Sequence, residues 1–225
     1  MAILSLCDLT GNAVRPWADA GHKCYCIDIQ HKRKRTEGNI TFLSYDVLKL
    51  ANDGAPLVDW IDWDFVFAWP PCTDLAVSGA RWFKEKGLGR LVKALAIVEA
   101  CKQITSHIGA PWMLENPVGT ISSYWRKPDY TFHPHEFGGY AGGADDDYTK
   151  KTCLWTGEGF VMPERRPIPV NPKTGNRIHM AAPSEDRANI RSATPVGFSQ
   201  AVYEANNGIE SEQEEATTKT ETLLF

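Results

Sequence analysis

Short apolar runs that alternate with helical patterns constrain the fold of this chain more than any other feature of its sequence. Each run is bounded by polar or turn-forming residues, as buried strands are, and the runs cover residues 2–6, 23–28, 40–43, 65–69, 112–114 and 152–155. Helices are predicted over residues 12–20, with Asn12 as the N-cap, over residues 88–107 and over residues 194–206. This alternation predicts an α/β fold built on a doubly wound, mostly parallel sheet.

Residues capable of chemistry follow the predicted strands. Gly11, Asp28, Asp46, Cys72 and Glu115 each come after one of the apolar runs. In open parallel sheets, ligands bind at the carboxyl ends of the strands, near the point where the strand order reverses. The sequence therefore predicts one ligand site at this edge of the sheet.

The negative charge of the chain is concentrated near its C-terminus. The formal net charge is −4, and residues 209–225 contain five glutamates and one lysine, so residues 1–208 are neutral as a group. We expect residues 1–208 to form one folded domain and residues 209–225 to be an acidic, disordered tail. A nucleic-acid partner would have to contact a local basic face, because the overall charge does not favour one.

Targeting signals and cysteine spacing point to a protein of the cytoplasm. No apolar run approaches the roughly 20 residues of a membrane-spanning helix, and the N-terminal segment lacks the pattern of an export signal. None of the six cysteines forms a C-x-x-C pair. We therefore expect reduced thiols, with no disulfide framework, no metal site and no membrane contact.

Two short strings carry the clearest chemical signal. In Trp69-Pro-Pro-Cys72, two prolines stiffen the turn after a buried strand and fix the direction of the thiol. In Leu114-Glu-Asn-Pro117, a carboxylate ends the neighbouring strand. Taken singly, each residue also has a simple structural interpretation. Cys72 could be a small buried apolar residue, and Glu115 could be an exposed acid at the end of a strand. Together, a thiol and a carboxylate in one pocket suit attack on an electron-poor ring.

The first two strand ends predict a nucleoside site. An acid at the end of the second strand, here Asp28, is placed to bond a ribose. The turn Asp8-Leu-Thr-Gly-Asn12 offers one glycine where a dinucleotide site has three, so a pyrophosphate cradle is not expected. Asp46 is placed to accept a hydrogen bond from an adenine amino group.

Taken together, these residues resemble the DNA cytosine-5 methyltransferases, especially small phage-type members of that family. The resemblance extends over residues 2–206, through LSLCDLTGN, FAWPPCTDLAVSG, MLENPVG, TKKTCLWTG and SATPVGFSQAVYEAN. It implies a Rossmann-like, S-adenosylmethionine-dependent methyltransferase domain over residues 1–208. It also implies a substrate cytosine that is flipped out of the DNA duplex.

The resemblance assigns roles to individual residues. The thiolate of Cys72 would add to cytosine C6, and Glu115 would hold the ring N3 and the amino group. The expected cofactor-binding residues are Leu9, Thr10, Gly11, Asn12, Asp28, Ile29, Asp46 and Ser199. The expected substrate-binding residues are Pro71, Asn116, Lys150, Lys151, Arg165 and Arg166. A thiol is only a few per cent ionised at neutral pH, so Lys150 and Lys151 are candidates for the charge that favours the thiolate.

The chain also departs from the family pattern. Only residues 158–189 are available where family members carry a large target-recognition domain, so we expect a low or short sequence specificity. Two basic stretches are candidates for contacting phosphates: residues 31–35, and the stretch from Arg165 and Arg166 to Arg187, which we favour because of its expected position.

Two alternatives to this function, and one further partner, stay open from the sequence. The same chemistry would also serve a free cytosine nucleotide such as dCMP. A catalytically silent homologue that binds DNA or a host factor is a second possibility, although Cys72 and Glu115 are intact. The last three residues, Leu223, Leu224 and Phe225, resemble the end of a sliding-clamp-binding peptide. We expect the protein to act as a monomer.

Overall fold

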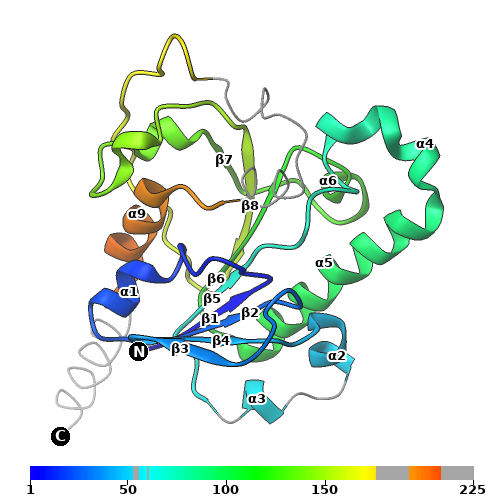
Figure 1. Ribbon diagram of the computed structural model, residues 1–225, viewed down its shortest axis with the longest axis horizontal. Helices are drawn as coiled ribbons and strands as arrows, with labels where there is room; N and C mark the ends of the chain where they lie inside the picture. The colour runs from blue at the N-terminus through cyan, green and yellow to red at the C-terminus, as the bar shows by residue number, and fades with distance from the viewer. Residues whose placement is uncertain (53–55, 60, 176–192, 209–225) are drawn as a thin grey trace, which may run out of the picture.

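A single twisted sheet forms the centre of the molecule and has helices on both faces (Figure 1). The computed structural model describes residues 1–52, 56–59, 61–175 and 193–208. Within these residues the sheet has eight strands in the order β3-β4-β2-β1-β5-β6-β8-β7. The α/β class predicted from the alternation of strands and helices is confirmed.

Five neighbouring strands of this sheet run parallel. They are β4 (Ile40–Leu43), β2 (Lys23–Ile27), β1 (Ala2–Leu6), β5 (Phe65–Ala68) and β6 (Trp112–Pro117). From β1 the chain first adds strands on one side and then returns to add β5 and β6 on the other. The strand order therefore reverses between β1 and β5, and this reversal creates the kind of crevice in which parallel sheets bind ligands.

Three further strands pair antiparallel, so the sheet that was predicted to be mostly parallel is a mixed one. β3 (Arg35–Glu37) pairs antiparallel with β4, and β8 (Thr152–Gly157) and β7 (Tyr130–Phe132) extend the other edge antiparallel to their neighbours. Strands β3 and β7 were not predicted from the sequence. Both are only three residues long and mostly exposed, so they lack the apolar run by which a buried strand is recognised.

Alternate residues of the strands face opposite layers of helices. Leu4 and Leu6 pack toward α5 (Leu88–Ile108), α2 (Val47–Asn52) and α3 (Pro56–Asp59). Ile3 packs toward α1 (Arg15–Asp19) and α9 (Val196–Asn206). This alternation follows from the two-residue period of a strand, and it buries both faces of β1.

Several short elements complete the described part of the chain. They are η1 (Val77–Trp82), α4 (Phe83–Lys86), α6 (Ile121–Tyr124), η2 (Pro134–Phe137) and η3 (Gly143–Asp145). No described helix combines the length and the apolar character that crossing a membrane requires. The acidic tail, the Leu223-Leu224-Phe225 tip and residues 176–189 of the short insertion lie outside the described residues.

Two element boundaries differ from their predictions for clear reasons. The first helix begins at Arg15 with Val14 as its N-cap, not at Asn12, because Pro16 fits only in the first turn of a helix. The strand β6 runs on to Pro117, so Glu115 lies inside a strand and not after one. Pairing with β8 extends β6, since Glu115 lies opposite Leu154 in an antiparallel ladder.

Candidate active site

A cleft of about 280 Å³ opens at the carboxyl ends of β1, β2 and β5, beside β6. Seven of the residues predicted to form the site line it: Leu9, Thr10, Asp28, Pro71, Cys72, Glu115 and Lys150. The lining also includes Cys7, Asp8, Gln30, Trp69, Pro70, Thr73, Pro117, Ala193 and Thr194. The structure thus brings the thiol, the buried carboxylate and the strand-end acid together at the switch point of the sheet.

Asp8 organises the turn at the end of β1. Its Oδ1 accepts hydrogen bonds from the backbone N–H groups of Thr10 (3.0 Å) and Gly11 (2.7 Å), and its Oδ2 accepts one from the Ser5 hydroxyl (2.8 Å). Gly11 has a φ of +72°, and a Cβ there would lie 3.0 Å from the ring of Phe42. Asp8 was not among the site residues predicted from the sequence. The signal was present, because an aspartate that begins such a turn bonds the backbone two or three residues later.

Asp28 presents a carboxylate to the cleft from the end of β2. Its Oδ1 accepts a hydrogen bond of 2.7 Å from the backbone N–H of Gln30. Burial raises the pKa of this carboxyl, and the Gln30 N–H and the nearby His31 oppose the rise only in part. Asp28 lines the cleft, so its carboxylate is within reach of a hydroxyl of a ligand bound there.

Cys7 also lines the cleft, but it is held as a neutral thiol. A hydrogen bond with Cys101 raises the pKa of Cys7 well above its usual value, and burial raises it further. Asp28 and Asp46 add to the effect because a negative charge nearby disfavours the thiolate. Cys7 is therefore a poor nucleophile at neutral pH.

The loop that carries Cys72 is fastened to β6. The side-chain amide of Asn116 donates a hydrogen bond of 2.8 Å to the carbonyl of Pro70. The carbonyl of Cys72 accepts hydrogen bonds from the backbone N–H groups of Leu75 (3.0 Å) and Ala76 (2.9 Å). Asn116 is fully buried, so it holds the loop in place and does not line the cleft.

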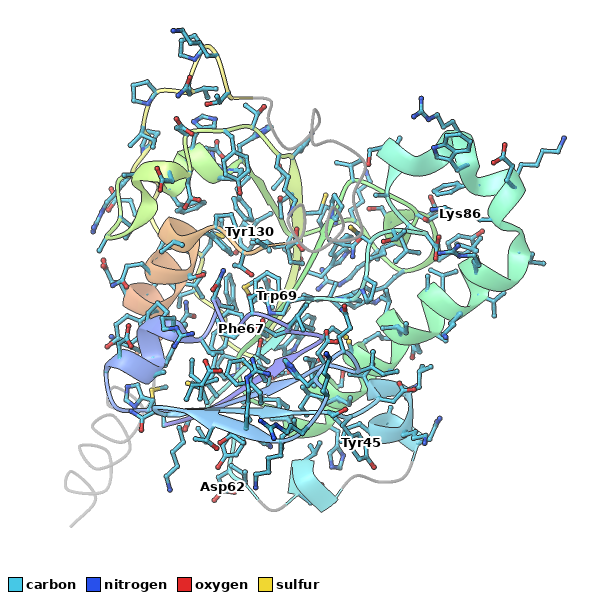
Figure 2. All side chains as sticks on the ribbon, in the orientation of Figure 1. Tyr45, Asp62, Phe67, Trp69, Lys86 and Tyr130 are labelled. Atoms are coloured by element: carbon cyan, nitrogen blue, oxygen red, sulfur yellow. The ribbon has the colours of Figure 1, made fainter. Side chains whose placement is uncertain are left out.

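Ion pairs fasten the other side of the same loop. Asp74 pairs with Lys86 (2.9 Å) and with Arg90 (3.1 Å), and Lys86 also donates a hydrogen bond to the carbonyl of Thr73. Lys86 is labelled in Figure 2, at the bend between α4 and α5. The backbone next to Cys72 is thus bound both to the sheet and to the helices.

A close backbone contact at Gly119 aligns the Cys72 loop with the end of β6. Ala76 and Gly119 form a β-bridge, and the backbone N–H and hydroxyl of Thr120 both donate to the carbonyl of Leu75 (2.9 and 2.8 Å). A Cβ at position 119 would lie only 2.2 Å from that carbonyl oxygen. Glycine is therefore required for the two segments to approach this closely.

Gly119→Ala should accordingly displace the Cys72 loop and destabilise the fold. Overpacking of this kind costs about 1–3 kcal/mol, which lowers the melting temperature by roughly 2–12 °C in a protein of this size. Calorimetry or circular dichroism would measure it. The control is Gly89→Ala, where no atom lies within 4 Å of the new Cβ. Equal melting temperatures of the two variants would contradict the requirement for glycine at position 119.

Glu115 lies at the inner end of the cleft, close to one cation. Its Oε1 is 3.7 Å from Nζ of Lys150, and the two side chains are 11% and 12% exposed. Oε1 is buried and has no partner within hydrogen-bond distance. Burial raises the pKa of the Glu115 carboxyl, and Lys150 and Thr152 offset the rise only in part. A buried acceptor that points into a cleft is a natural contact for a polar ligand.

A small hollow continues from the cleft behind Glu115. Four of its lining residues are aromatic or apolar and four are polar. The apolar ones are Trp69, Phe132, Pro195 and Phe198, and the polar ones are Glu115, Lys150, Thr152 and Thr194. The indole of Trp69, near the centre of Figure 2, donates a hydrogen bond of 3.1 Å to the Ser5 hydroxyl. The hollow has a volume of only about 10 Å³, roughly the space that one water molecule needs.

The other predicted site residues lie outside the cleft lining. Ile29 is 70% exposed beside Asp28, and Asp46 accepts a hydrogen bond from the N–H of Leu48 at the start of α2 (2.9 Å). Ser199 is buried in α9 and donates to the carbonyl of Pro195. The remaining residues outside the lining are Gly11, Asn12, Asn116, Lys151, Arg165 and Arg166.

The two basic stretches proposed to contact phosphates are partly engaged with the protein itself. Arg165 pairs with Glu136 (3.7 Å), while Arg166 pairs with Glu204 (3.4 Å) and stacks on Tyr140. In residues 31–35, His31 is buried, and only the central Lys32, Arg33 and Lys34 are exposed. Arg165 and Arg166 are therefore paired within the protein, and His31 is buried, so none of the three is free to contact a phosphate.

Comparisons with known proteins do not identify a family for this chain. Neither the models of known protein families nor the curated proteins contain a match to this chain.

Proposed function

We propose that this protein is an S-adenosylmethionine-dependent methyltransferase that acts on C5 of cytosine in DNA through a covalent bond to Cys72. The observation that carries the proposal is the position of Cys72 and Glu115 in one cleft, with Asp28 in the same lining. A thiol and a carboxyl of raised pKa that line the same cleft suit addition to a pyrimidine ring.

The residues at the β1 and β2 end of the cleft fit the nucleoside part of S-adenosylmethionine. The Asp28 carboxylate in the cleft lining is placed for a ribose hydroxyl, and the exposed side chains of Ile29 and Tyr45 adjoin the strand-end acids Asp28 and Asp46 in the sequence. The turn organised by Asp8 lacks a phosphate cradle, in keeping with a cofactor that has no phosphates. When bound, S-adenosylmethionine supplies an electrophilic methyl group.

In the proposed reaction, the Cys72 thiolate forms a bond to C6 of the cytosine and breaks the C5–C6 double bond. The electron pair moves to C5, which would take the methyl group from S-adenosylmethionine, so that the bond between sulfur and this methyl group breaks and S-adenosylhomocysteine leaves. A base then removes the C5 proton, the C5–C6 double bond re-forms, and the thiolate leaves C6. The bracing of the Cys72 loop by Asn116 and Asp74 keeps the sulfur in one position for both addition and departure.

Glu115 and Lys150 control charge on the ring during these steps. A carboxyl whose pKa is raised holds a proton longer, so Glu115 is suited to keep a proton at N3 as negative charge develops there. Lys150, 3.7 Å from Glu115, places a positive charge in the same cleft as Cys72. That charge favours the thiolate form of a nearby cysteine.

Mass spectrometry of nucleosides tests the proposal directly. The purified protein, incubated with DNA and S-adenosylmethionine, should convert deoxycytidine into 5-methyldeoxycytidine, and dCMP in place of DNA should give little product. Bisulfite sequencing of the same DNA should show methylation in many sequence contexts. Absence of 5-methyldeoxycytidine would refute the proposed reaction, and equal conversion of dCMP would assign a free nucleotide as the substrate.

Asp28→Ala should weaken the binding of S-adenosylmethionine by about ten- to a hundredfold, because a hydrogen bond to a charged group contributes about 1.5–3 kcal/mol. Isothermal titration calorimetry measures the affinity. The control is Asp62→Ala, an exposed aspartate that precedes β5 at the opposite edge of the sheet (Figure 2). Equal affinities of the two variants would remove Asp28 from the cofactor site.

A further inference from the structure

A basic surface that the sequence analysis did not single out lies next to the Cys72 loop. Residues 77–93, which form η1, α4 and the start of α5, contain five basic residues and one acid, whereas residues 1–208 as a whole are neutral. We call this segment the basic elbow. Its cations are Arg81, Lys84, Lys86, Arg90 and Lys93. In Figure 1 the elbow forms one side of the molecule, where α4 and the start of α5 project beyond the sheet.

Only part of this positive charge is neutralised within the protein. Lys86 and Arg90 pair with Asp74, as described above. Lys84 and Lys93 are exposed and form no ion pair with any residue that the structure describes. Two cations without a protein partner, on a surface of one sign, are suited to contact phosphates.

An exposed aromatic side chain lies among these cations. The indole of Trp82 is 46% exposed, and the guanidinium of Arg81 lies 5.0 Å from the centre of its ring. Packing thus leaves a large flat apolar group in contact with water. An exposed aromatic ring surrounded by basic residues is the combination that proteins use to bind single-stranded nucleic acid, because every base has a face that stacks.

The basic elbow is joined closely to the cleft. The backbone N–H of Val77 donates to the carbonyl of Val118 (2.9 Å), and a Cβ at Gly79 would lie 3.6 Å from the carbonyl oxygen of Thr73. Thr73 and its neighbour Cys72 line the cleft. From Gly79, η1 continues for three residues to Trp82, a rise of about 6 Å at the pitch of a 3₁₀ helix. Trp82 thus follows by three residues a segment that packs against the Cys72 loop, and we expect a strand whose base enters the cleft to pass near it.

We infer that the basic elbow binds a single DNA strand beside the target cytosine, with Trp82 stacking on an unpaired neighbouring base and with Lys84 and Lys93 contacting phosphates. The inference rests on the proposed function and narrows its substrate to single-stranded or locally opened DNA. Within a duplex each base is already stacked between its neighbours, so Trp82 would gain a stacking partner only where the strand is unpaired. A duplex would offer this surface its phosphates alone.

Fluorescence anisotropy tests the inference with a labelled cytosine-containing oligonucleotide, either single-stranded or annealed to its complement, without S-adenosylmethionine. The wild-type protein should bind the single strand more tightly at equal salt. Trp82→Ala should weaken that binding by about tenfold, because it removes the ring on which a base stacks. Trp82→Phe should weaken it much less, because phenylalanine keeps an aromatic ring. Tyr130→Ala, at an aromatic side chain of β7 that is 39% exposed, is the control and should bind as the wild type does.

Salt dependence tests the role of the lysines. For single strands the slope of log K against log salt is negative, and each lost phosphate contact reduces its magnitude by about 0.7. Lys84→Ala combined with Lys93→Ala should therefore reduce the magnitude by about 1.4. Lys23→Ala combined with Lys49→Ala removes the same charge from exposed positions in β2 and α2 and should leave the slope unchanged. Tighter binding of the duplex, or an unchanged affinity of Trp82→Ala, would overturn the inference.

The outcomes for the surface and for the reaction are separable. Binding is measured without methyl transfer, so a protein that makes no 5-methyldeoxycytidine but loses single-strand affinity on Trp82→Ala refutes the reaction and supports the surface. A protein that methylates DNA with the same affinity before and after Trp82→Ala supports the reaction and refutes the surface.

Discussion

Cys72→Ser should abolish the covalent bond to cytosine and lower methyl transfer by at least about a thousandfold. Removing the nucleophile of an enzyme that acts through a covalent bond causes losses of this size or larger. A serine hydroxyl occupies nearly the same space, but at neutral pH it is essentially un-ionised and attacks C6 poorly. The substitution therefore tests the chemistry of the sulfur with little change in the packing of the loop.

An oligonucleotide containing 5-fluorocytosine makes this test sharp. Fluorine at C5 cannot be removed as a proton is, so the bond between sulfur and C6 persists and survives denaturing electrophoresis. The wild-type protein should give a slower band with this oligonucleotide and S-adenosylmethionine, and Cys72→Ser should give none. Cys24→Ser is the control, because Cys24 is buried in β2 with its sulfur 3.6 Å from the carbonyl of Val14, which a hydroxyl can also approach. A band of equal intensity with Cys72→Ser would refute the mechanism.

The parallel strands and the Cys72 loop were predictable because local sequence determines them. A run such as Phe65–Ala68 is apolar on both faces and can only be buried, and the two prolines before Cys72 stiffen the loop wherever it lies. The short antiparallel strands β3 and β7 were not predictable in this way, although β8 was predicted from its apolar run. The residues of β3 are polar, and they form a strand because a two-residue turn, Gly38-Asn39, folds them back on β4.

The basic elbow was not recognised in the sequence for a similar reason. A run of charges is visible in a sequence, as in residues 31–35, whereas Arg81, Lys84, Lys86, Arg90 and Lys93 are separated by apolar residues and glycines. They form one surface only because η1, α4 and α5 bend around the Cys72 loop. Conversely, Arg165 and Arg166 looked available in the sequence, but their partners Glu136 and Glu204 are distant along the chain. Which cations are neutralised is a property of the tertiary structure.

Glu115→Gln should lower methyl transfer by about a hundred- to ten-thousandfold while leaving the fold intact, because glutamine keeps the shape and a hydrogen-bond donor but cannot exchange a proton with N3. The loss should appear mainly in kcat, since the proton is needed as charge develops on the ring. For the wild-type protein, kcat should fall as the pH rises through the raised pKa of Glu115. Wild-type activity in Glu115→Gln would exclude the carboxyl from the reaction.

The effect of the same substitution on stability has a predictable sign. A carboxyl whose pKa is raised on folding contributes stability below its ordinary pKa, and this contribution is lost as the pH rises through the raised value. Ionised Glu115 is therefore a cost to the fold at neutral pH, which Lys150 offsets only in part. The melting temperature of Glu115→Gln should equal or exceed that of the wild-type protein at pH 7–8, and the difference should vanish toward pH 5.

Asp129→Asn is the matched control, with the opposite sign. Burial acts to raise the pKa of Asp129, but hydrogen bonds from Arg126 and Thr156 outweigh it and lower the pKa. The ionised carboxylate then stabilises the fold above its ordinary pKa, and this stability is lost as the pH falls. Asp129→Asn should melt below the wild-type protein at pH 7 and approach it in acid. If Glu115→Gln were also destabilised most at neutral pH, Glu115 would be a structural ion-pair partner of Lys150, and the raised pKa assigned to it would be wrong.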